Sequence, residues 1–204
     1  MRKIVVLTFM TLDGVMQAPG GPEEDSADSF PYGGWSVSYW DDVLADEMGN
    51  QMGQDFDLLL GRKTYDIFAA NWPTIDPDSI INKAKKYVVS SNPIPPDTDI
   101  WKNSVRIDGE IAEKIRALKS EEGPDLHVHG SSKLTQALLK NELVDELWLK
   151  IYPVTIGAGK RLFGSGTVPA AFNVKECRLS SSGVILAKYE KSGDIKLASF
   201  QSDD

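Results

Sequence analysis

Four short runs of residues have the composition of β-strands, and three of them end at a glycine or at small polar residues. They are KIVVLTF at 3–9, DFDLLLG at 55–61, KYVVSSN at 86–92 and DLHVHG at 125–130. The first run lacks polar alternation, which is typical of a strand covered on both faces. Segments with helical spacing follow the second and fourth runs. This alternation predicts an α/β fold with a mainly parallel central sheet and helices on both faces.

The last third of the chain has a different strand pattern. Residues 144–154 (VDELWLKIYPV) alternate, which predicts a strand with two distinct faces. One face carries Leu147, Leu149 and Ile151, and the other carries Trp148, Lys150 and Tyr152. Residues 172–179 and 184–190 are two further strands joined by SSSG, which predicts a C-terminal antiparallel hairpin. We expect residues 1–198 to form a single domain and residues 199–204 to be a frayed tail.

Composition narrows the class of function. Lys and Arg number 22 against 30 Asp and Glu, a net charge of −8, so the chain has no basic field to attract nucleic acid. Cys177 is the one cysteine, which excludes an internal disulfide, and no Cys/His cluster is spaced for zinc. The apolar run at the N-terminus is too short to span a membrane. These features predict a cytoplasmic protein in a reducing compartment, with no membrane partner and no metal.

Residues 17–40 form the longest stretch without periodicity, rich in Gly, Pro and acids, and such stretches are uncommon inside a domain. They are interpreted either as a partly ordered excursion or as a lid over a pocket. Four aromatic residues favour the lid: Phe30, Tyr32, Trp35 and Tyr39. Asp41 or Asp42 then caps a predicted helix. Its apolar positions are Leu44, Met48 and Met52. The proline-rich segment 93–99 must be a loop, because proline cannot donate to a strand ladder.

Small or donor-rich residues follow three of the predicted strands. They are Gly61-Arg62-Lys63-Thr64, Ser90-Ser91-Asn92 and Gly130-Ser131-Ser132-Lys133. In an open α/β sheet, ligands bind at the carboxyl ends of the strands, where unpaired N–H groups of helix N-termini favour phosphate. Together the three ends predict a site for a ligand with several phosphates. Each alone also fits a simpler interpretation, with Arg62 a solvated charge and Ser131 and Ser132 ordinary helix caps.

Motifs for other chemistries are absent. GAGKRLFG at 157–164 is neither a dinucleotide fingerprint nor a P-loop, and the sequence has no G-x-S-x-G. His127 and His129 share one face of a strand and are interpreted as ordinary strand residues, because no third metal ligand has suitable spacing. His129 directly precedes Gly130, however, so it lies near the predicted phosphate site.

Carboxylates are the remaining candidates for proton transfer. Asp13 follows the first strand, where it can orient the next loop or assist proton transfer. Four acids cluster at the start of the first predicted helix: Asp41, Asp42, Asp46 and Glu47. For any one of them, a cap or a solvated face is the more common role than a general acid.

Six motifs occur in one order along nearly the whole chain. They are TLDG at 11–14, LLGRKTY at 59–65, KYVVSS at 86–91, VHGSSKL at 128–134, VDELWLKIYPV at 144–154 and GAGKRLF at 157–163. In this order the chain resembles the dihydrofolate reductase superfamily, and especially its branch related to the C-terminal reductase domain of bifunctional riboflavin-biosynthesis deaminase/reductases. The resemblance implies a dihydrofolate reductase-like fold, an NADPH-dependent reductase and a homodimer.

The resemblance also implies which residues bind NADPH. The 2′-phosphate and diphosphate would contact Gly61, Arg62, Lys63 and Thr64. The adenosine end would contact Ser90 and Ser91. The diphosphate would lie on Gly130, Ser131 and Ser132, with His129 beside them. The nicotinamide would lie along Gly14, Val15 and Met16.

For the substrate, the resemblance implies a pyrimidine- or pterin-like heterocycle. Folate-reducing members carry a buried acid in the first helix, and here Asp46 aligns with it only approximately, with Glu47 beside it. We take Asp13 and Asp46 as the candidate catalytic residues. Because basic residues for a folate tail have no counterpart, 5-amino-6-(5-phosphoribosylamino)uracil is favoured over folate. A dihydrofolate reductase proper, a non-catalytic nucleotide-binding module and a plain scaffold remain the alternatives.

Overall fold

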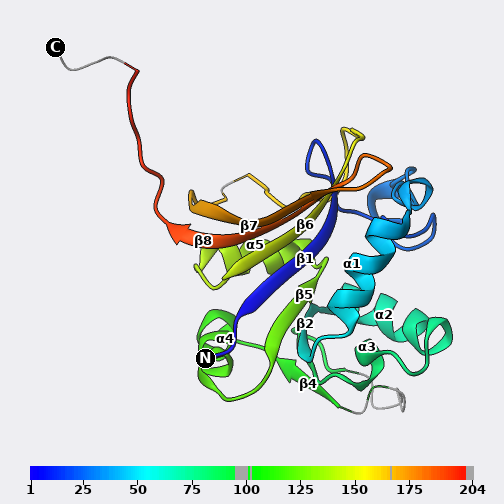
Figure 1. Ribbon diagram of the computed structural model, residues 1–204. Helices are drawn as coiled ribbons and strands as arrows, with labels where there is room; N and C mark the ends of the chain where they lie inside the picture. Colours follow the sequence, from blue (N-terminus) through cyan, green and yellow to red (C-terminus); the bar gives the residue numbers. More distant parts are fainter. Residues whose placement is uncertain (95–100, 102, 166, 201–204) are drawn as a thin grey trace.

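An eight-stranded sheet forms the centre of the computed structural model, which describes residues 1–94, 101, 103–165 and 167–200 (Figure 1). The strands are β1 (Ile4–Thr11), β2 (Phe56–Gly61), β3 (Lys86–Val89), β4 (Ser104–Ile107), β5 (Asp125–His129), β6 (Glu146–Tyr152), β7 (Ala171–Leu179) and β8 (Ile185–Gly193). Their order is β4-β3-β2-β5-β1-β6-β8-β7. The first six in this order are parallel, and β8 and β7 add antiparallel pairings at one edge. The predicted sheet and its C-terminal hairpin are therefore confirmed.

Helices cover both faces of the sheet, as predicted. The helices are α1 (Asp42–Met52), α2 (Arg62–Ile75), α3 (Ile80–Lys83), α4 (Ile111–Ser120) and α5 (Ser132–Lys140), with 3-10 turns η1 (Ala27–Ser29) and η2 (Val37–Tyr39). On one face, Ile115 of α4 and Leu138 of α5 pack in one cluster with Val6 of β1. On the other face, Tyr65 of α2 packs with Leu60 of β2. Each such fully buried aliphatic side chain contributes about 1.5–3 kcal/mol of hydrophobic stabilisation.

The central strand β1 explains the lack of alternation in its sequence. Its residues Ile4, Val5, Val6 and Leu7 are each at most 3% exposed. β5 and β6 pair with the two edges of β1, and helices lie above and below it. Both faces of β1 are therefore apolar, as expected for a buried parallel strand.

Although β6 alternates between apolar and polar residues, its polar face does not point to solvent. Lys150 is 3% exposed and Tyr152 is fully buried, so the second face of the strand is covered as well as the first. The rings of Trp35 and Tyr39 lie 5.2 and 5.8 Å from the ring of Tyr152. Residues of the segment 17–40, together with α1, thus cover this face of β6.

Some local features differ from the predictions. The short helix α3 was not predicted, because its four residues are too few to show helical periodicity. Its cap is Ser79, whose hydroxyl accepts a hydrogen bond from the Ile81 amide at 3.3 Å. The segment RKTYDIFAANW at 62–72 has the composition of a helix, and α2 continues three residues beyond it, through Pro73 to Ile75. Residues 95–99 of the predicted loop and 201–204 of the predicted tail lie outside the described residues.

The chain beyond β8 runs away from the sheet (Figure 1). Ile195 is 51% exposed and Leu197 is 92% exposed in this segment. In the described part of the chain, no helix combines the length and the apolar composition needed to cross a bilayer.

Candidate active site

The carboxyl ends of β2 and β5 meet through one serine hydroxyl. Ser131 Oγ accepts a hydrogen bond from the Gly61 amide at 3.0 Å and donates one to Thr64 Oγ1 at 2.9 Å. Gly61 and Ser131 are the N-caps of α2 and α5, so the N-termini of these two helices converge. Two of the three predicted strand ends are therefore joined directly.

Ser131 is not an ordinary helix cap. Its backbone has a left-handed conformation with φ 52°, directly after Gly130 with φ 57°. Within the described residues, no side chain caps the N-terminus of α2 or α5. The first N–H groups of both helices consequently remain available to an outside acceptor, at the positive ends of the two helix dipoles. This local arrangement favours an anionic ligand.

The third strand end joins the other two through Arg62. Arg62 Nε contacts the carboxylate oxygens of Asp66 at 2.8 and 3.0 Å, and its Nη1 donates to the Pro93 carbonyl at 2.8 Å. Pro93 follows β3 by a few residues, next to Ser90 and Ser91. Ser90 Oγ bonds to the backbone of Asn92. We call the strand ends at 61–64, 90–93 and 130–132 the rim.

Asp25, from the segment 17–40, closes one edge of the rim. Its carboxylate contacts Lys63 Nζ at the start of α2 and also Lys160 Nζ. These two ammonium groups lower the pKa of Asp25 despite its burial, and the Asp25 hydrogen bond raises the pKa of Lys63. Gln17 fixes the segment, because its amide donates to the Asp25 and Ala27 carbonyls at 3.0 Å. These contacts hold this part of the segment in place, which argues against the partly ordered excursion, while the lid stays a prediction.

The loop after β1 is pinned to the segment 155–162. Asp13 accepts hydrogen bonds from Thr11 Oγ1 at 2.5 Å and from the Gly157 amide at 2.7 Å. These bonds lower the pKa of Asp13 to about 2, with the Thr11 hydroxyl as the largest cause. A carboxyl group this acidic is charged at neutral pH. The structure therefore supports the loop-orienting role of Asp13 and not proton donation.

The predicted nicotinamide contacts lie in this same loop. Val15 is fully buried and Met16 is 6% exposed. The Gly14 carbonyl accepts a hydrogen bond from the Leu162 amide at 3.1 Å, and Met16 donates to the Lys160 carbonyl at 2.8 Å. Gly14 has φ 82°, which glycine adopts without strain. The loop that would flank the nicotinamide is thus held at a fixed distance from residues 160–162.

The structure corrects the prediction for the acid in the first helix. Asp41 is the cap, and its Oδ1 accepts from the Leu44 amide at 3.0 Å. Asp46 is exposed, whereas Glu47 is 3% exposed. The helical repeat places Leu44, Glu47 and Gln51 on the buried face and directs Asp46 to solvent. Asp46 is therefore not placed to protonate a buried substrate.

A polar cluster fills the space between α1 and the sheet. Gln51 Nε2 donates to Glu47 Oε1 at 2.8 Å, and Lys150 Nζ donates to Gln51 Oε1 at 2.8 Å. Lys188 Nζ lies 3.2 Å from Glu47 Oε1, and Arg178 Nη1 lies 3.7 Å from Glu47 Oε2. These side chains come from α1, β6, β7 and β8.

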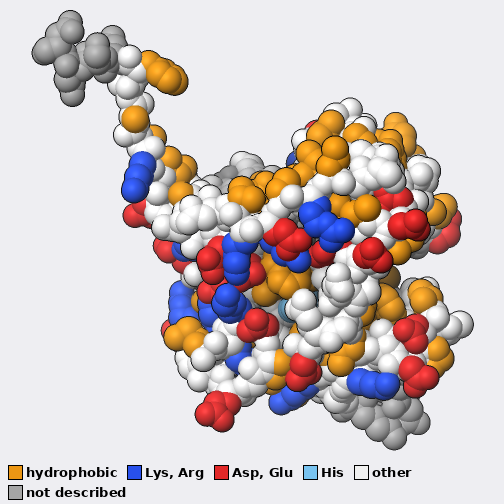
Figure 2. Space-filling view, in the orientation of Figure 1, with side chains coloured by type: hydrophobic (Ala, Val, Ile, Leu, Met, Phe, Trp, Pro, Cys, Tyr) orange, Lys and Arg blue, Asp and Glu red, His pale blue; other side chains and the backbone are white. Residues whose placement is uncertain are grey.

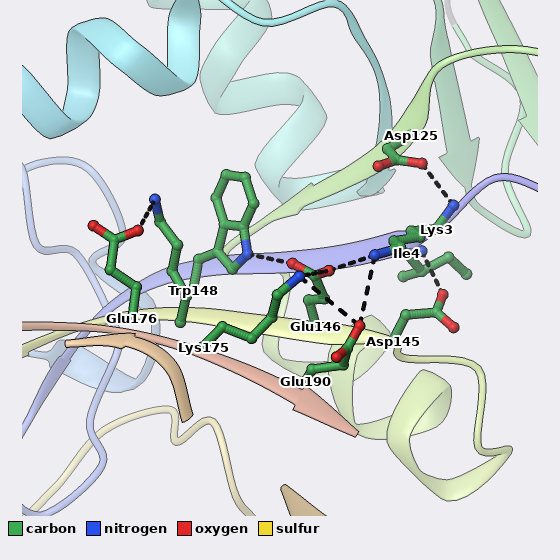
Figure 3. Close-up of polar contacts among 10 residues, drawn as sticks. Lys3, Ile4, Asp125, Asp145, Glu146, Trp148, Lys175, Glu176 and Glu190 are labelled. Atoms are coloured by element: carbon green, nitrogen blue, oxygen red, sulfur yellow. Dashed lines mark hydrogen bonds and ion pairs between the residues drawn. The ribbon is translucent and has the colours of Figure 1, made fainter. Parts of the chain in front are cut away.

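These residues border a small hollow, which we call the α1 hollow. It is lined by Glu47, Gln51, Trp148, Lys150, Glu176 and Lys188. Figure 2 shows hydrophobic side chains and a histidine at the bottom of a depression between α1 and the hairpin, with charged side chains around it. Figure 3 shows Trp148 beside it, between Glu146 and Glu176. The Trp148 indole donates to Glu146 Oε2 at 2.8 Å.

The two histidines lie on this same face of the sheet, below the rim. The His129 ring packs near Phe56 and Phe68, so its side chain lies away from the rim although its backbone directly precedes Gly130. Burial lowers the pKa of His127 to about 4 and that of His129 to about 3, which makes both neutral at pH 7. Among the residues that the structure describes, no group of three His, Cys, Asp or Glu side chains could hold a metal ion.

Sequence reasoning missed Lys150, Glu47 and Gln51 as members of one cluster. The sequence pattern places Lys150 on one face of a strand and predicts a cap or a solvated position for Glu47. The available signal was the i, i+4 spacing of Glu47 and Gln51 beside Leu44, which is a polar continuation of an apolar helix face. Lys150 gave no signal, because its burial depends on α1, about 100 residues away.

The strand order and the rim at the carboxyl ends of β2, β3 and β5 define a dihydrofolate reductase-like α/β protein. The family model described as the RibD C-terminal domain matches residues 2–186. The chain therefore belongs to the RibD C-terminal domain family. This match confirms the predicted resemblance to the reductase branch.

Three known proteins illustrate the similarity. The uncharacterized protein YyaP of Bacillus subtilis (strain 168) is 28% identical over 199 residues, which cover 94% of this chain and 96% of that protein. A pyrimidine reductase-like protein from Corynebacterium diphtheriae has a TM-score of 0.65 at 14% identity, over 95% of this chain and 93% of that one. Dihydrofolate reductase from Enterococcus faecalis, complexed with NADP(H) and RAB-propyl, has a TM-score of 0.55 at 14% identity, over 93% and 96%.

Proposed function

We propose that this protein is an NADPH-dependent reductase of a pyrimidine- or pterin-like heterocycle. The observation that carries the proposal is the contact of Ser131 with Gly61 and Thr64, which brings the N-termini of α2 and α5 to one rim. Two uncapped helix N-termini together suit a diphosphate better than a single phosphate. Membership of the RibD C-terminal domain family and the fold shared with an NADP(H)-bound enzyme support the same conclusion.

The residues of the rim fit a dinucleotide. Gly61 packs closely against Ser131, since a Cβ atom on Gly61 would lie in van der Waals contact with Ser131 Oγ at 3.4 Å. Thr64, Gly130, Ser131 and Ser132 would hold the diphosphate, and Arg62 and Lys63 the 2′-phosphate. Bound NADPH would supply a hydride. The chain would fix the position of the cofactor and exclude water from the reacting atoms.

A pyrimidine substrate is favoured over folate by the α1 face. At this face Leu44 is apolar and fully buried, Asp46 points to solvent, and Glu47 is ion-paired with Lys188 and Arg178. No free buried acid therefore stands among the described residues of α1 to serve a pterin ring. The substrate that we propose is 5-amino-6-(5-phosphoribosylamino)uracil, whose opened ribose is reduced. A homodimer is part of the proposal.

The direct test is cofactor binding followed by turnover. We expect NADPH to raise the Tm, since a ligand at about 100 times its Kd adds roughly 2.7 kcal/mol to stability. We then expect NADPH oxidation with the phosphoribosylamino-uracil and little with dihydrofolate. Binding without turnover of any heterocycle would favour the non-catalytic module. The absence of a Tm shift at millimolar NADPH would contradict the cofactor site itself.

A further inference from the structure

Lys150 is a buried ammonium group at the height of the rim. Lys150 of β6 pairs with Phe9 of β1. Two residues earlier on β1, Leu7 pairs with Trp148 of β6 on one side and with His129 of β5 on the other. The Gly130 amide donates to the Leu7 carbonyl at 3.3 Å, so the rim begins one residue after this level. Neighbouring strands lie about 4.8 Å apart, which puts the backbone of Lys150 about 10 Å from that of Gly130 across β1. Lys150 and Gly130 therefore lie on opposite sides of β1.

We propose that Lys150 is the proton donor to the C=O or C=N group that is reduced in the substrate. The inference rests on the proposed reductase function and deepens it. Its geometrical basis is that Lys150 lines the α1 hollow and that its Nζ donates a hydrogen bond to Gln51 Oε1 at 2.8 Å. Gln51 is in turn held by Glu47.

The surroundings of Lys150 suit an acid that works near neutral pH. Burial lowers the pKa of Lys150 to about 8, while the negative charge of Glu47 opposes that shift and the positive charge of Lys188 adds to it. His127 and His129 face it from β5 as neutral rings, and Tyr152 on the same strand has a pKa raised to about 12 by burial. Lys150 is therefore the group of this set whose pKa best matches general-acid catalysis at pH 7–8.

The proton balance is simple. An N–H bond of the Lys150 ammonium breaks, and the proton forms a bond to the nitrogen or oxygen of the C=N or C=O group. The carbon of that group takes the hydride of the reduced nicotinamide dinucleotide, so the substrate gains two electrons and two hydrogens. The neutral amine of Lys150 then recovers a proton from water that enters the α1 hollow.

Two substitutions separate charge from proton release. Lys150→Met removes the ammonium proton and keeps an unbranched side chain that is one atom shorter. Lys150→Arg keeps a positive charge that can bond to Gln51, but a guanidinium does not release its proton at neutral pH. Lys86→Met is the matched control, because Lys86 is fully buried in β3 with a pKa that burial also lowers to about 8. Its Nζ bonds to the Asn82 carbonyl, outside the α1 hollow.

We expect both Lys150 variants to lose about 100-fold or more in kcat, with an NADPH Kd within about twofold of the wild type. We expect the wild-type kcat to fall as the pH rises through about 8. The residual kcat of Lys150→Arg should not show this alkaline limb of the pH profile. The Lys86→Met control should retain the wild-type pH profile. A Lys150→Arg variant with full kcat, or an unchanged alkaline limb in it, would overturn the proposal.

A titration that needs no turnover distinguishes this inference from the proposed function. Side-chain ¹⁵N NMR of lysine-labelled protein, with the Lys150→Met spectrum for assignment, follows Lys150 directly. We expect its signal to titrate near pH 8 and to shift when 5-amino-6-(5-phosphoribosylamino)uracil is added with NADP⁺. If Lys150 stays charged above pH 10, the inference fails even if the enzyme reduces the pyrimidine. If Lys150 titrates near pH 8 but wild-type protein turns over no heterocycle, the reductase proposal is the part that fails.

Discussion

Ser131 Oγ lies 2.9 Å from Thr64 Oγ1, so a hydroxyl contact joins the first turns of α5 and α2 although 67 residues separate them in the sequence. The same Ser131 oxygen accepts from the Gly61 amide. This arrangement positions two helix N-termini as one anion site. Predictions about the cofactor therefore depend first on Ser131.

Ser131→Ala tests the junction of the two helices. Loss of both hydrogen bonds lets the N-termini separate, and we expect NADPH binding to weaken about three- to tenfold. Titration of NADPH fluorescence measures this change. Ser120→Ala is the control, because Ser120 is exposed and its hydroxyl bonds to the Arg116 carbonyl of its own helix. Equal affinities for the Ser131 variant and the wild type would show that the junction does not support the cofactor.

Arg62→Ala tests the proposed 2′-phosphate contact. The guanidinium is oriented by Asp66 and the Pro93 carbonyl. We expect about 10- to 100-fold weaker NADPH binding and little change for NADH, because only NADPH carries the extra phosphate. Arg116→Ala is the control, since the exposed Arg116 bonds to the Asn141 carbonyl, away from the rim. Equal losses for the two cofactors in Arg62→Ala would contradict the assignment.

Asp25→Asn tests the role of the segment 17–40. Asp25 neutralises Lys63 and Lys160 at the edge of the rim. Its removal frees two positive charges, so we expect NADPH binding to tighten about two- to fivefold and to become more sensitive to salt. Calorimetric titrations at two salt concentrations measure both effects, with the exposed Glu23→Gln as control. Weaker binding in Asp25→Asn would mean that Asp25 holds the lid closed over bound cofactor.

Glu146 links acid stability to the hairpin. It is 4% exposed and accepts hydrogen bonds from Lys3 at 2.7 Å, Trp148 at 2.8 Å and Lys175 at 3.0 Å (Figure 3). Although burial opposes it, these donors together lower the pKa of Glu146 to about 2 from an ordinary 4.5. The stabilisation from the charged form is therefore fully present above pH 4.5 and is lost as the pH falls toward 2.

We expect Glu146→Gln to lower the free energy of unfolding at pH 7 by about 1–2 kcal/mol, because the lysines lose a charged acceptor. We also expect a shallower decline in stability between pH 4.5 and 2. Urea unfolding across this pH range measures both. Glu190→Gln is the control, since Glu190 is near the same lysines at 3.7 and 3.8 Å but half-exposed. A Glu146→Gln variant with the wild-type decline would assign acid unfolding to other carboxylates.

The sheet and the rim could be predicted because their signals are local. Gly61 and Gly130 end their strands directly before helices, and parallel strands place such ends on one side of the sheet. The hairpin after β6 was marked by SSSG between two strands. These features depend on a few neighbouring residues, which sequence patterns report well.

The α1 hollow could not be predicted, because it depends on packing between distant elements. Asp46 and Glu47 are neighbours in the sequence, but a shift of one residue along a helix turns a side chain from solvent toward the core. Lys150 is buried only because α1 covers β6, and Asp25 reaches Lys160 across 135 residues of sequence. Polar residues in such positions have the same local pattern as exposed ones.

The rim as a dinucleotide site is tested most directly by amide ¹H–¹⁵N spectra of the wild-type protein during titration with NADPH. We expect the largest shifts at the amides of residues 61–64 and 130–132, with smaller ones at 14–16. If the chemical shifts of those amides stay unchanged at millimolar NADPH, the rim is not the dinucleotide site. Shifts confined to residues around Arg116 and Lys140, at the opposite end of the strands, would contradict it equally.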